Sequence, residues 1–386
     1  MTKNTQIKTN ELQHLVDIAD RFKPQGQIIN IQEYGSGNIN HTYLVTVDAA
    51  SEKYFILQRL NTQVFQQPKL VMNNMDIVTN HLSNRLQQEN LSSDKPSAYA
   101  SFVDGRFWYT PRVLLTSEGE NYWLDNNGLF WRAITFIPNS KSFDTIQNTN
   151  HAEEIGYGLG MFHNLTSDLT VDKLADTLPG FHITPSYLDK FQNLIATIRL
   201  AMSPEIDYCL RFINSRLSLA SVLENAKAEN KLRLRTIHGD PKINNIMLDR
   251  NRGKAIAVID LDTVKPGLIH YDLGDCLRSG CNPLGEETSD WEKVYFAPEY
   301  AQSILQGYFS VAKFLTQSDR EYIYDAIRLL SFELGLRFFT DYLAGNTYFK
   351  ADYPQHNLAR ALVQFQLTES IESQASTIQK IIQDLP

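Results

Sequence analysis

The stretch from residue 236 to residue 262 constrains the fold of this chain more than any other. Two short apolar segments, Ile246 to Leu248 and Ala255 to Ile259, stand in a part of the sequence that is otherwise dominated by helical patterns. The residues between them, Asp249 to Gly253, are polar and end in glycine, which is typical of the turn of a β-hairpin. The sequence therefore predicts a hairpin embedded in a helical domain.

The first third of the chain has a different pattern. Alternating apolar residues predict three early strands, at 28–34, 42–47 and 54–60. A helix is predicted over 69–86, where apolar residues can share one broad face, and residues 91–101 are predicted to form a loop. A second hairpin is predicted at 121–125 and 129–137 around Asn126-Asn127-Gly128, because asparagine and glycine tolerate the positive φ of such turns.

The composition of the chain changes along the polar stretch from Pro138 to Asn150. Beyond it we predict helices at 151–165, 185–200, 205–227 and 318–343. Because 386 residues exceed one ordinary core, we expect two lobes. The predicted fold class is α+β, with an antiparallel sheet lobe at 1–138 that binds nucleotide and a mainly helical lobe at 139–386 that carries catalysis and substrate binding.

Charge and composition narrow the class of function. The formal net charge is −8, so neither nucleic acid nor a membrane surface is an expected partner. No apolar run approaches a membrane span, and the first ten residues are polar. The chain has only three cysteines, which favours a reducing, cytoplasmic location. It has no CxxC pair or HExxH motif, so we expect no dedicated zinc site.

Chemistry is concentrated in the loop that precedes the embedded hairpin and in the strand that ends it. Asp240, Lys242 and Asn245 follow one another at offsets of two and five residues, and Asp260 stands at the end of the second strand. Phosphoryl transfer needs a group that orients the attacking hydroxyl, positive charge on the phosphates, and oxygen ligands for metal ions. These four residues match that requirement in order, so the sequence predicts a kinase active site.

Each of these residues has an expected role. Asp240 would accept the proton of the acceptor hydroxyl, and Lys242 would place positive charge on the migrating phosphoryl group. Asn245 and Asp260 would bind the metal ions that bridge the phosphates. Asp262 could hold metal through water or orient the loop, and it ranks below Asp260. We expect His238 to stabilise the loop rather than to donate a proton.

A glycine-containing segment lies between the first two predicted strands. Gly35, Ser36, Gly37 and Asn38 could cover the phosphates, since glycine lets backbone N–H groups approach them closely. The alternative is an ordinary hairpin turn, because position 40 is Asn40 rather than the third glycine of GxGxxG. No GxxxxGK[ST] motif is present.

The third predicted strand has no lysine where kinases carry one for the triphosphate. Arg59 could supply the cation from the strand face of Phe55 and Leu57, and Gln58 on the opposite face is the competing choice. Asp76 on the following helix is a candidate carboxylate partner. Residues 133–137 would lie between the lobes and hydrogen-bond adenine through the backbone, with Thr135 and Ile137 as the contact positions.

At these residues the chain resembles a known family. The sequences HGDPKINNIML and VIDLDTV are similar to those of the aminoglycoside phosphotransferase and choline kinase-like family. Further segments are similar to the N-acetylhexosamine 1-kinase branch of this family. They are EYGSGNINHTYLV, YFILQRLN, WRAITFIPNSKSFD, LPGFH, YDLGDCLRS and ELGLRFFTDYLAGNTYFK. The resemblance implies a protein-kinase-like bilobal fold, use of ATP and Mg²⁺, and phosphorylation of the anomeric hydroxyl of N-acetylglucosamine or N-acetylgalactosamine.

The acceptor site is less clearly marked. A sugar site needs fixed polar groups, and the candidates are His182, Asp272, Asp275, Arg278 and Arg337. For most of them the alternative is a helix cap or an ion pair between helices. Two other functions stay open: a kinase of choline, homoserine, an aminoglycoside or another sugar on the same fold, and a nucleotide-binding module without catalysis. The sequence leaves the oligomeric state open.

Overall fold

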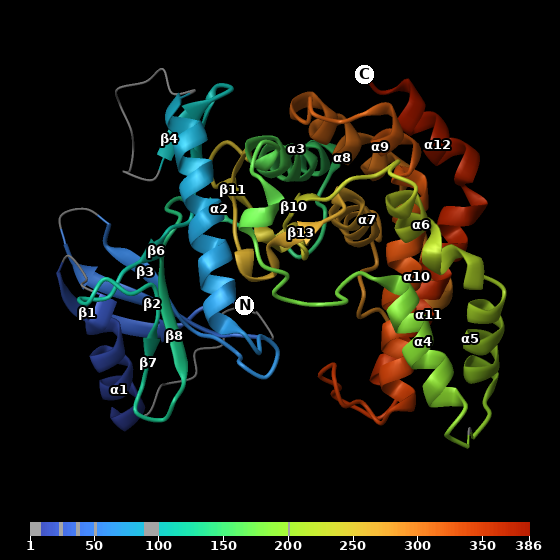
Figure 1. Ribbon diagram of the computed structural model, residues 1–386, viewed down its shortest axis with the longest axis horizontal. Coiled ribbons are helices and arrows are strands. Elements are labelled where there is room, and N and C mark those ends of the chain that lie inside the picture. Colours follow the sequence, from blue (N-terminus) through green and yellow to red (C-terminus); the bar gives the residue numbers. More distant parts are fainter. Residues whose placement is uncertain (1–8, 23–25, 36–38, 50–51, 89–99, 200) are drawn as a thin grey trace.

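The computed structural model describes residues 9–22, 26–35, 39–49, 52–88, 100–199 and 201–386. It has an antiparallel sheet lobe and a helical lobe, which confirms the predicted α+β class. The sheet lobe contains the N-terminal residues, and the helices of the other lobe follow it in the chain (Figure 1). The boundary predicted at residue 138 falls between two strands, and the division there stays a prediction.

The main sheet of the first lobe has the strand order β1-β2-β3-β8-β6, with β7 also paired to β8. Its strands are β1 (Gln27–Glu33), β2 (His41–Asp48), β3 (Tyr54–Arg59), β6 (Val113–Leu114), β7 (Trp123–Leu124) and β8 (Phe130–Thr135). All of these pairings are antiparallel. The three early strands and the hairpin around Gly128, whose φ is +74°, are therefore confirmed.

Two helices flank this sheet. Helix α1 (Thr9–Ala19) packs Leu15 and Ile18 against Phe55 and Leu57 on one face. Helix α2 (Pro68–Gln88), predicted at 69–86, stands between the sheet and the helical lobe (Figure 1). It begins with proline, which suits the first helical turn, and buries its apolar positions in a core shared with the second lobe. A separate hairpin joins β4 (Ala100–Val103) to β5 (Arg106–Tyr109).

The second lobe is built mainly of helices. Helix α3 (Thr149–Thr166) packs against α8 (Pro298–Val311), and α10 (Ile323–Leu343) packs against α11 (His356–Ser373) and α7 (Ile269–Gly280). The others are α4 (Thr184–Ile195), α5 (Pro204–Asn214), α6 (Val222–Ala228), α9 (Gln317–Glu321) and α12 (Ala375–Asp384). Within the described ranges of the chain, none of the helices has an apolar stretch of the length that a bilayer requires.

Four predictions about element boundaries are wrong. The helix predicted at 185–200 is α4, which ends at Ile195. The helix predicted at 205–227 is two helices, because α5 ends at Asn214 and a short 3-10 segment, Leu217–Ser221, precedes α6. The helix predicted at 318–343 is divided at Tyr322 into α9 and α10. Residues 100–101, predicted as loop, begin strand β4, while residues 89–99 of that predicted loop lie outside the described residues.

The embedded hairpin belongs to the second lobe in sequence, and its second strand contacts both α3 and β5. It consists of β11 (Ile246–Asp249) and β12 (Ala255–Val258), which confirms the prediction. Strand β9 (Ser140–Lys141) pairs with β11, and β10 (Arg235–Ile237) pairs with β13 (Lys265–Gly267). The predicted catalytic loop connects β10 to β11, and Asp260 follows β12, so both reach the same end of the hairpin.

Candidate active site

The catalytic loop turns sharply at Gly239, whose φ is +86°. A side chain at this position would place its Cβ 2.7 Å from the carbonyl oxygen of Thr263. Glycine is therefore required twice, by the backbone conformation and by the close approach of the second segment. This packing brings the loop that begins with His238 against the turn that follows Asp260.

Asp272 of helix α7 fixes the backbone of the catalytic loop through hydrogen bonds. Its carboxylate accepts the backbone N–H groups of His238 at 2.6 Å and of Gly239 at 2.8 Å. His163 of α3 donates from Nε2 to the same carboxylate at 2.8 Å, and Nδ1 of this ring lies 2.7 Å from the hydroxyl of Tyr308. Asp272 is fully buried, so a charged acceptor inside the core fixes the loop backbone.

His238 connects the two halves of the site. Its Nε2 lies 2.8 Å from the carbonyl oxygen of Ile259, while Nδ1 lies 3.3 Å from the backbone N–H of Asp240. A carbonyl only accepts and an N–H only donates, so the neutral ring carries its proton on Nε2. The side chain is fully buried. His238 therefore acts as a loop-stabilising residue in this geometry, as expected from the sequence.

Asp240 and Lys242 form a pair at the surface of the loop. The Lys242 ammonium donates to Oδ2 of Asp240 at 3.0 Å, and half of the lysine side chain is exposed. The Asp240 carboxylate is the largest influence on Lys242 and raises its pKa, so the ammonium stays charged. Within the described part of the chain, no hydrogen bond is found to Oδ1 of Asp240, which leaves this oxygen for an acceptor hydroxyl.

Asn245 and Asp260 stand on either side of the strand ends. Asn245 is buried, and its side-chain Nδ2 donates to the backbone carbonyl oxygen of Asp240 at 2.8 Å. The backbone carbonyl of Asn245 accepts the N–H of Ile259. The side-chain amide oxygen of Asn245, Oδ1, is a suitable metal ligand. Asp260 has a left-handed backbone, with φ +63° and ψ +56°, and this conformation turns the chain out of β12.

The charge environment of Asp260 suits a divalent cation. Protein surrounds its carboxylate on most sides even though solvent reaches the side chain, and this loss of hydration is the largest influence on its pKa. Repulsion from Asp262 and Asp240 adds to it and raises the pKa of Asp260 to about 7. A divalent cation would relieve this repulsion, and Asn245 and Asp260 supply the hard oxygen atoms that Mg²⁺ prefers.

No group of three or more His, Cys, Asp or Glu side chains suited to a metal ion is found among the described residues. A magnesium ion of a phosphotransferase needs no such cage, because substrate phosphates and water complete its coordination. The residues present therefore fit Mg²⁺ held by Asn245 and Asp260.

Asp262 lies two residues beyond Asp260 and makes contacts to the other lobe. Its Oδ1 lies 2.5 Å from Nη2 of Arg132 on β8, and its Oδ2 accepts from Nδ2 of Asn40 at 2.6 Å. Asp262 and Arg132 are both buried. Sequence reasoning missed Arg132, although a charged residue inside the apolar strand 130–135 was the signal that could have found it.

The structure does not bring Arg59 to these carboxylates. Arg59 lies on the same face of β3 as Phe55 and Leu57, and this face is the one that packs against α1. Gln58 faces the opposite side, where it pairs in register with Arg132. Asp76 of α2 accepts a hydrogen bond from Asn121.

Some of the residues expected to contact the nucleotide lie within the described part of the chain. Gly35 has φ +81° and open space around its α-carbon, whereas Ser36, Gly37 and Asn38 lie outside the described residues. Thr135 ends β8, and its backbone N–H donates to Arg112. Ile137 belongs to a small apolar cluster next to this strand end. The other buried members of that cluster are Ala100, Tyr109, Met247, Ile256 and Ala257.

His182 lies beneath the catalytic loop rather than in an open pocket. It is buried, with Nδ1 2.9 Å from Oε1 of Glu333 and Nε2 2.9 Å from the carbonyl oxygen of Gly239. Both partners are acceptors, so both ring nitrogens donate and the ring is positively charged. Burial is the largest single influence on the pKa of His182 and lowers it. The Glu333 carboxylate, the Asp275 charge and the Gly239 carbonyl together outweigh burial and raise the pKa of His182.

Two of the remaining acceptor candidates, Asp275 and Arg278, lie close to Asp240 and Lys242. Asp275 accepts from Arg278 at 2.7 Å, and both are buried. The Asp240 charge is one of the influences that raise the pKa of Arg278, and Asp275 is one of those that raise the pKa of Lys242. Asp272 and His182 therefore support the loop, and Asp275 and Arg278 form a buried ion pair within α7. A substrate role for Asp275, Arg278 and Arg337 stays a prediction.

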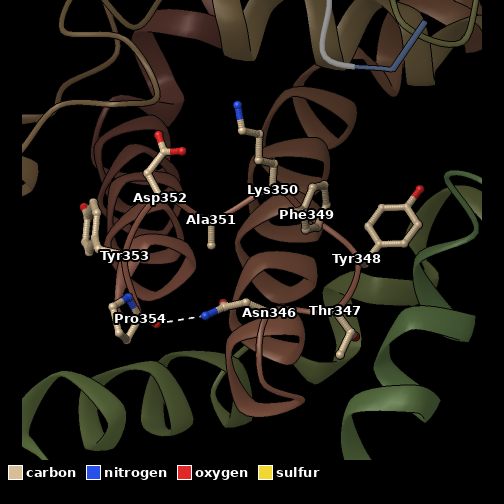
Figure 2. A pocket seen from close by; sticks show the side chains of 9 residues that line it. All are labelled: Asn346, Thr347, Tyr348, Phe349, Lys350, Ala351, Asp352, Tyr353 and Pro354. Atoms are coloured by element: carbon tan, nitrogen blue, oxygen red, sulfur yellow. Dashed lines mark hydrogen bonds between the residues drawn. The ribbon is translucent and has the colours of Figure 1, made fainter.

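Arg337 of α10 lies among aromatic rings. Its guanidinium carbon is 4.9 Å from the ring centroid of Tyr187 and 5.4 Å from those of Phe181 and Phe349. Phe349 belongs to the connection between α10 and α11, which surrounds an open pocket of about 550 Å³ (Figure 2). Residues 346–354 line this pocket, so it contains none of the four predicted catalytic side chains.

Comparisons with solved structures agree with this fold. The crystal structure of an aminoglycoside phosphotransferase from Alicyclobacillus acidocaldarius matches 96% of this chain and 96% of its own, with a TM-score of 0.60 and 15% identity. The GDP complex of an aminoglycoside 2'-phosphotransferase matches 92% of this chain and 98% of its own, with a TM-score of 0.57 and 13% identity. The choline kinase from Cryptosporidium parvum matches 92% and 91%, with a TM-score of 0.55 and 12% identity.

These identities are low, so the solved structures establish the fold alone. The profile of the phosphotransferase enzyme family matches residues 30–322, which include the catalytic loop and Asp260. Because that match covers well over half of the sequence, the chain belongs to the phosphotransferase enzyme family.

Proposed function

We propose that this protein transfers the γ-phosphoryl group of ATP to the anomeric hydroxyl of an N-acetylhexosamine. The observation that carries the proposal is the convergence of Asp240, Lys242, Asn245 and Asp260 at one end of the β11–β12 hairpin. The GDP complex of the similar aminoglycoside 2'-phosphotransferase supports a nucleotide as donor. The adenine ring of ATP would lie at the end of β8, beside the apolar cluster that contains Ile137 and Met247.

In the proposed reaction the acceptor hydroxyl oxygen forms a bond to the γ-phosphorus while the bond to the β–γ bridging oxygen breaks and ADP leaves. Oδ1 of Asp240 takes the hydroxyl proton, and Lys242, held by Oδ2 of the same carboxylate, faces the developing charge. Mg²⁺ bound by Asn245 and Asp260 would neutralise the phosphate oxygens. Asp240 contributes chiefly by orienting the hydroxyl, because the transition state is loose.

The charge balance near Asp240 supports a neutral acceptor. Four cations, Lys242, Arg278, Arg337 and the protonated His182, stand against four carboxylates in this region, those of Asp240, Asp275, Glu286 and Glu333. A site whose charges nearly cancel suits a polyhydroxyl molecule better than a cation. The rings that could enclose a quaternary ammonium, those of Phe181, Tyr187 and Phe349, already surround Arg337. This observation favours a sugar over choline or an aminoglycoside.

A panel of acceptors tests this proposal. Purified protein with ATP and Mg²⁺ is incubated separately with N-acetylglucosamine, N-acetylgalactosamine, glucose, homoserine, choline and kanamycin, and ADP release is measured. We expect release only with the N-acetylhexosamines, and an anomeric phosphate signal in the phosphorus NMR spectrum. Turnover with choline or kanamycin alone would replace the acceptor in the proposal. ATP binding without turnover on any member would favour a non-catalytic module.

A further inference from the structure

A buried ion pair joins the two lobes beside the candidate metal site. Arg132 lies on β8 of the sheet lobe, Asp262 follows β12, and each side chain is at most 3% exposed. Nη2 of Arg132 is 2.5 Å from Oδ1 of Asp262, and the two groups form an ion pair by proximity of charge, since this buried oxygen has no hydrogen-bond donor among the described residues. A buried charge is strongly unfavourable without its partner, so this contact fixes the two segments with respect to each other.

The Arg132 guanidinium is held in place by the sheet lobe itself. Its Nε and Nη2 donate to Oε1 of Gln58 on the neighbouring strand, at 3.0 and 2.8 Å. Nη1 lies 3.9 Å from the sulfur of Met72 and 3.7 Å from that of Met75, both on α2. Gln58 is itself fixed, because its Nε2 donates to the hydroxyl of Thr42 at 3.0 Å. The cation is thus oriented before any ligand binds.

The second oxygen of Asp262 extends the connection to β2. Nδ2 of Asn40, the residue before β2, donates to Oδ2 of Asp262 at 2.6 Å, and Oδ1 of Asn40 accepts the N–H of Asn61. Asp262 therefore contacts β8 and the start of β2 at once. It belongs to the 3-10 turn Leu261–Thr263, which continues directly from Asp260. Any displacement of Asp262 would move the Asp260 carboxylate.

We propose that Arg132 and Asp262 are positioning residues for phosphoryl transfer, whose ion pair sets the place of Asp260 relative to the nucleotide-binding strands. The pair would thereby join the sheet lobe to the metal-binding turn in a chain whose third strand carries no lysine for the triphosphate. This inference rests on the proposed function, because it assumes that a nucleotide with Mg²⁺ binds between β8 and Asp260. It assigns Asp262 to orientation of the turn rather than to metal coordination.

A double-variant cycle tests the pair. The variants are R132Q, D262N and the combination of both, and the readouts are the affinity for ADP with Mg²⁺, measured by calorimetry, and the thermal unfolding midpoint. R132K, which keeps the charge but cannot bond Gln58 and Asp262 together, completes the set. The exposed pair of Arg211 and Asp207 provides the matched control cycle, R211Q with D207N. R59Q tests the competing cation on β3.

We expect each single variant to lower the unfolding midpoint and to weaken binding of ADP with Mg²⁺ at least tenfold. R132K should fall between the wild type and R132Q. The combined variant contains no unpaired buried charge, so its unfolding midpoint should recover. Its nucleotide affinity should stay low but fall no further than in either single variant, since both changes break the same link. R59Q and the control cycle should bind ADP as the wild type does.

Three results would overturn the inference. Wild-type affinity in R132Q would show that Arg132 positions nothing. Recovery of both midpoint and affinity in the combined variant would reduce the pair to a structural contact. Losses of affinity that multiply in the combined variant would give Asp262 a separate role, as a metal ligand has. Because ADP binding is measured without acceptor, an error in the proposed sugar would leave all of these readouts unchanged.

Discussion

The backbone N–H of Gly239 donates to the carboxylate of Asp272 at 2.8 Å, and this bond joins the catalytic loop to the start of helix α7. The N–H of His238 donates to the same carboxylate, so two neighbouring peptide groups depend on one buried charge. The loop that carries Asp240 is therefore rigid because of a residue that lies well beyond it in the sequence. Its shape is part of the protein core, and changes in the core should alter catalysis.

Replacing Asp272 by asparagine should destabilise the protein and lower its turnover rate. An amide cannot match a carboxylate that accepts two backbone N–H groups and the Nε2 proton of His163. We expect the free energy of unfolding, measured in urea, to fall by about 3 kcal/mol. The matched control D290N changes an exposed pair with Lys293 and should cost less than about 0.5 kcal/mol. A loss in D272N as small as that of the control would contradict this role.

Replacing Gly239 by alanine should impair turnover more than stability explains. The new methyl group would meet the carbonyl oxygen of Thr263 and push the loop away from the turn after Asp260. We expect kcat to fall about tenfold or more, equivalent to about 1.4 kcal/mol in the barrier. Gly253 also has a positive φ, but its surroundings are open, so G253A is the control for backbone strain alone. Equal kcat values in the two variants would show that the close approach is unimportant.

The charge on His182 predicts a dependence of stability on pH. Its pKa is raised in the folded protein, so the folded state holds its proton more tightly than the unfolded chain does. This contribution is complete below the ordinary pKa of 6.5 and is lost as the pH rises through the higher folded pKa. Urea unfolding at pH 6 and at pH 9 should therefore show a larger loss in wild type than in H182Q.

His81, which is partly buried and paired with the exposed Asp168, provides the control for this measurement. We expect H81Q to keep the wild-type difference between the two pH values. If H182Q and wild type lose the same stability between pH 6 and pH 9, then His182 is not charged in the folded protein.

Much of this site follows from short-range patterns. The hairpin at 246–258 and the offsets of Asp240, Lys242 and Asn245 are local features, and each was predictable because the relevant residues lie within one loop and its strands. The roles of Asp272 and His182 were not predictable in this way. Both looked like substrate ligands because they are polar residues near conspicuous motifs, and only packing shows that their polar atoms face the loop backbone.

The cation near the metal site illustrates the same limit. Strand periodicity placed Arg59 on the face of Phe55 and Leu57, which is correct, but it could not say which face meets the other lobe. That depends on α1 covering one side of the sheet and on β8 pairing with β3, a contact between residues far apart in the chain. Arg132 reaches Asp262 only through this pairing. The break between α5 and α6 was missed because both segments carry helical periodicity.

The direct test of the account is the rate of ADP release by D240N in the presence of ATP, Mg²⁺ and N-acetylglucosamine. Asparagine keeps the size of Asp240 but cannot take the hydroxyl proton or hold Lys242 by charge. We predict that kcat falls about 100-fold or more, while the affinity for ADP with Mg²⁺ stays within about twofold of wild type. A wild-type rate in D240N would contradict the assignment of this loop as the catalytic centre.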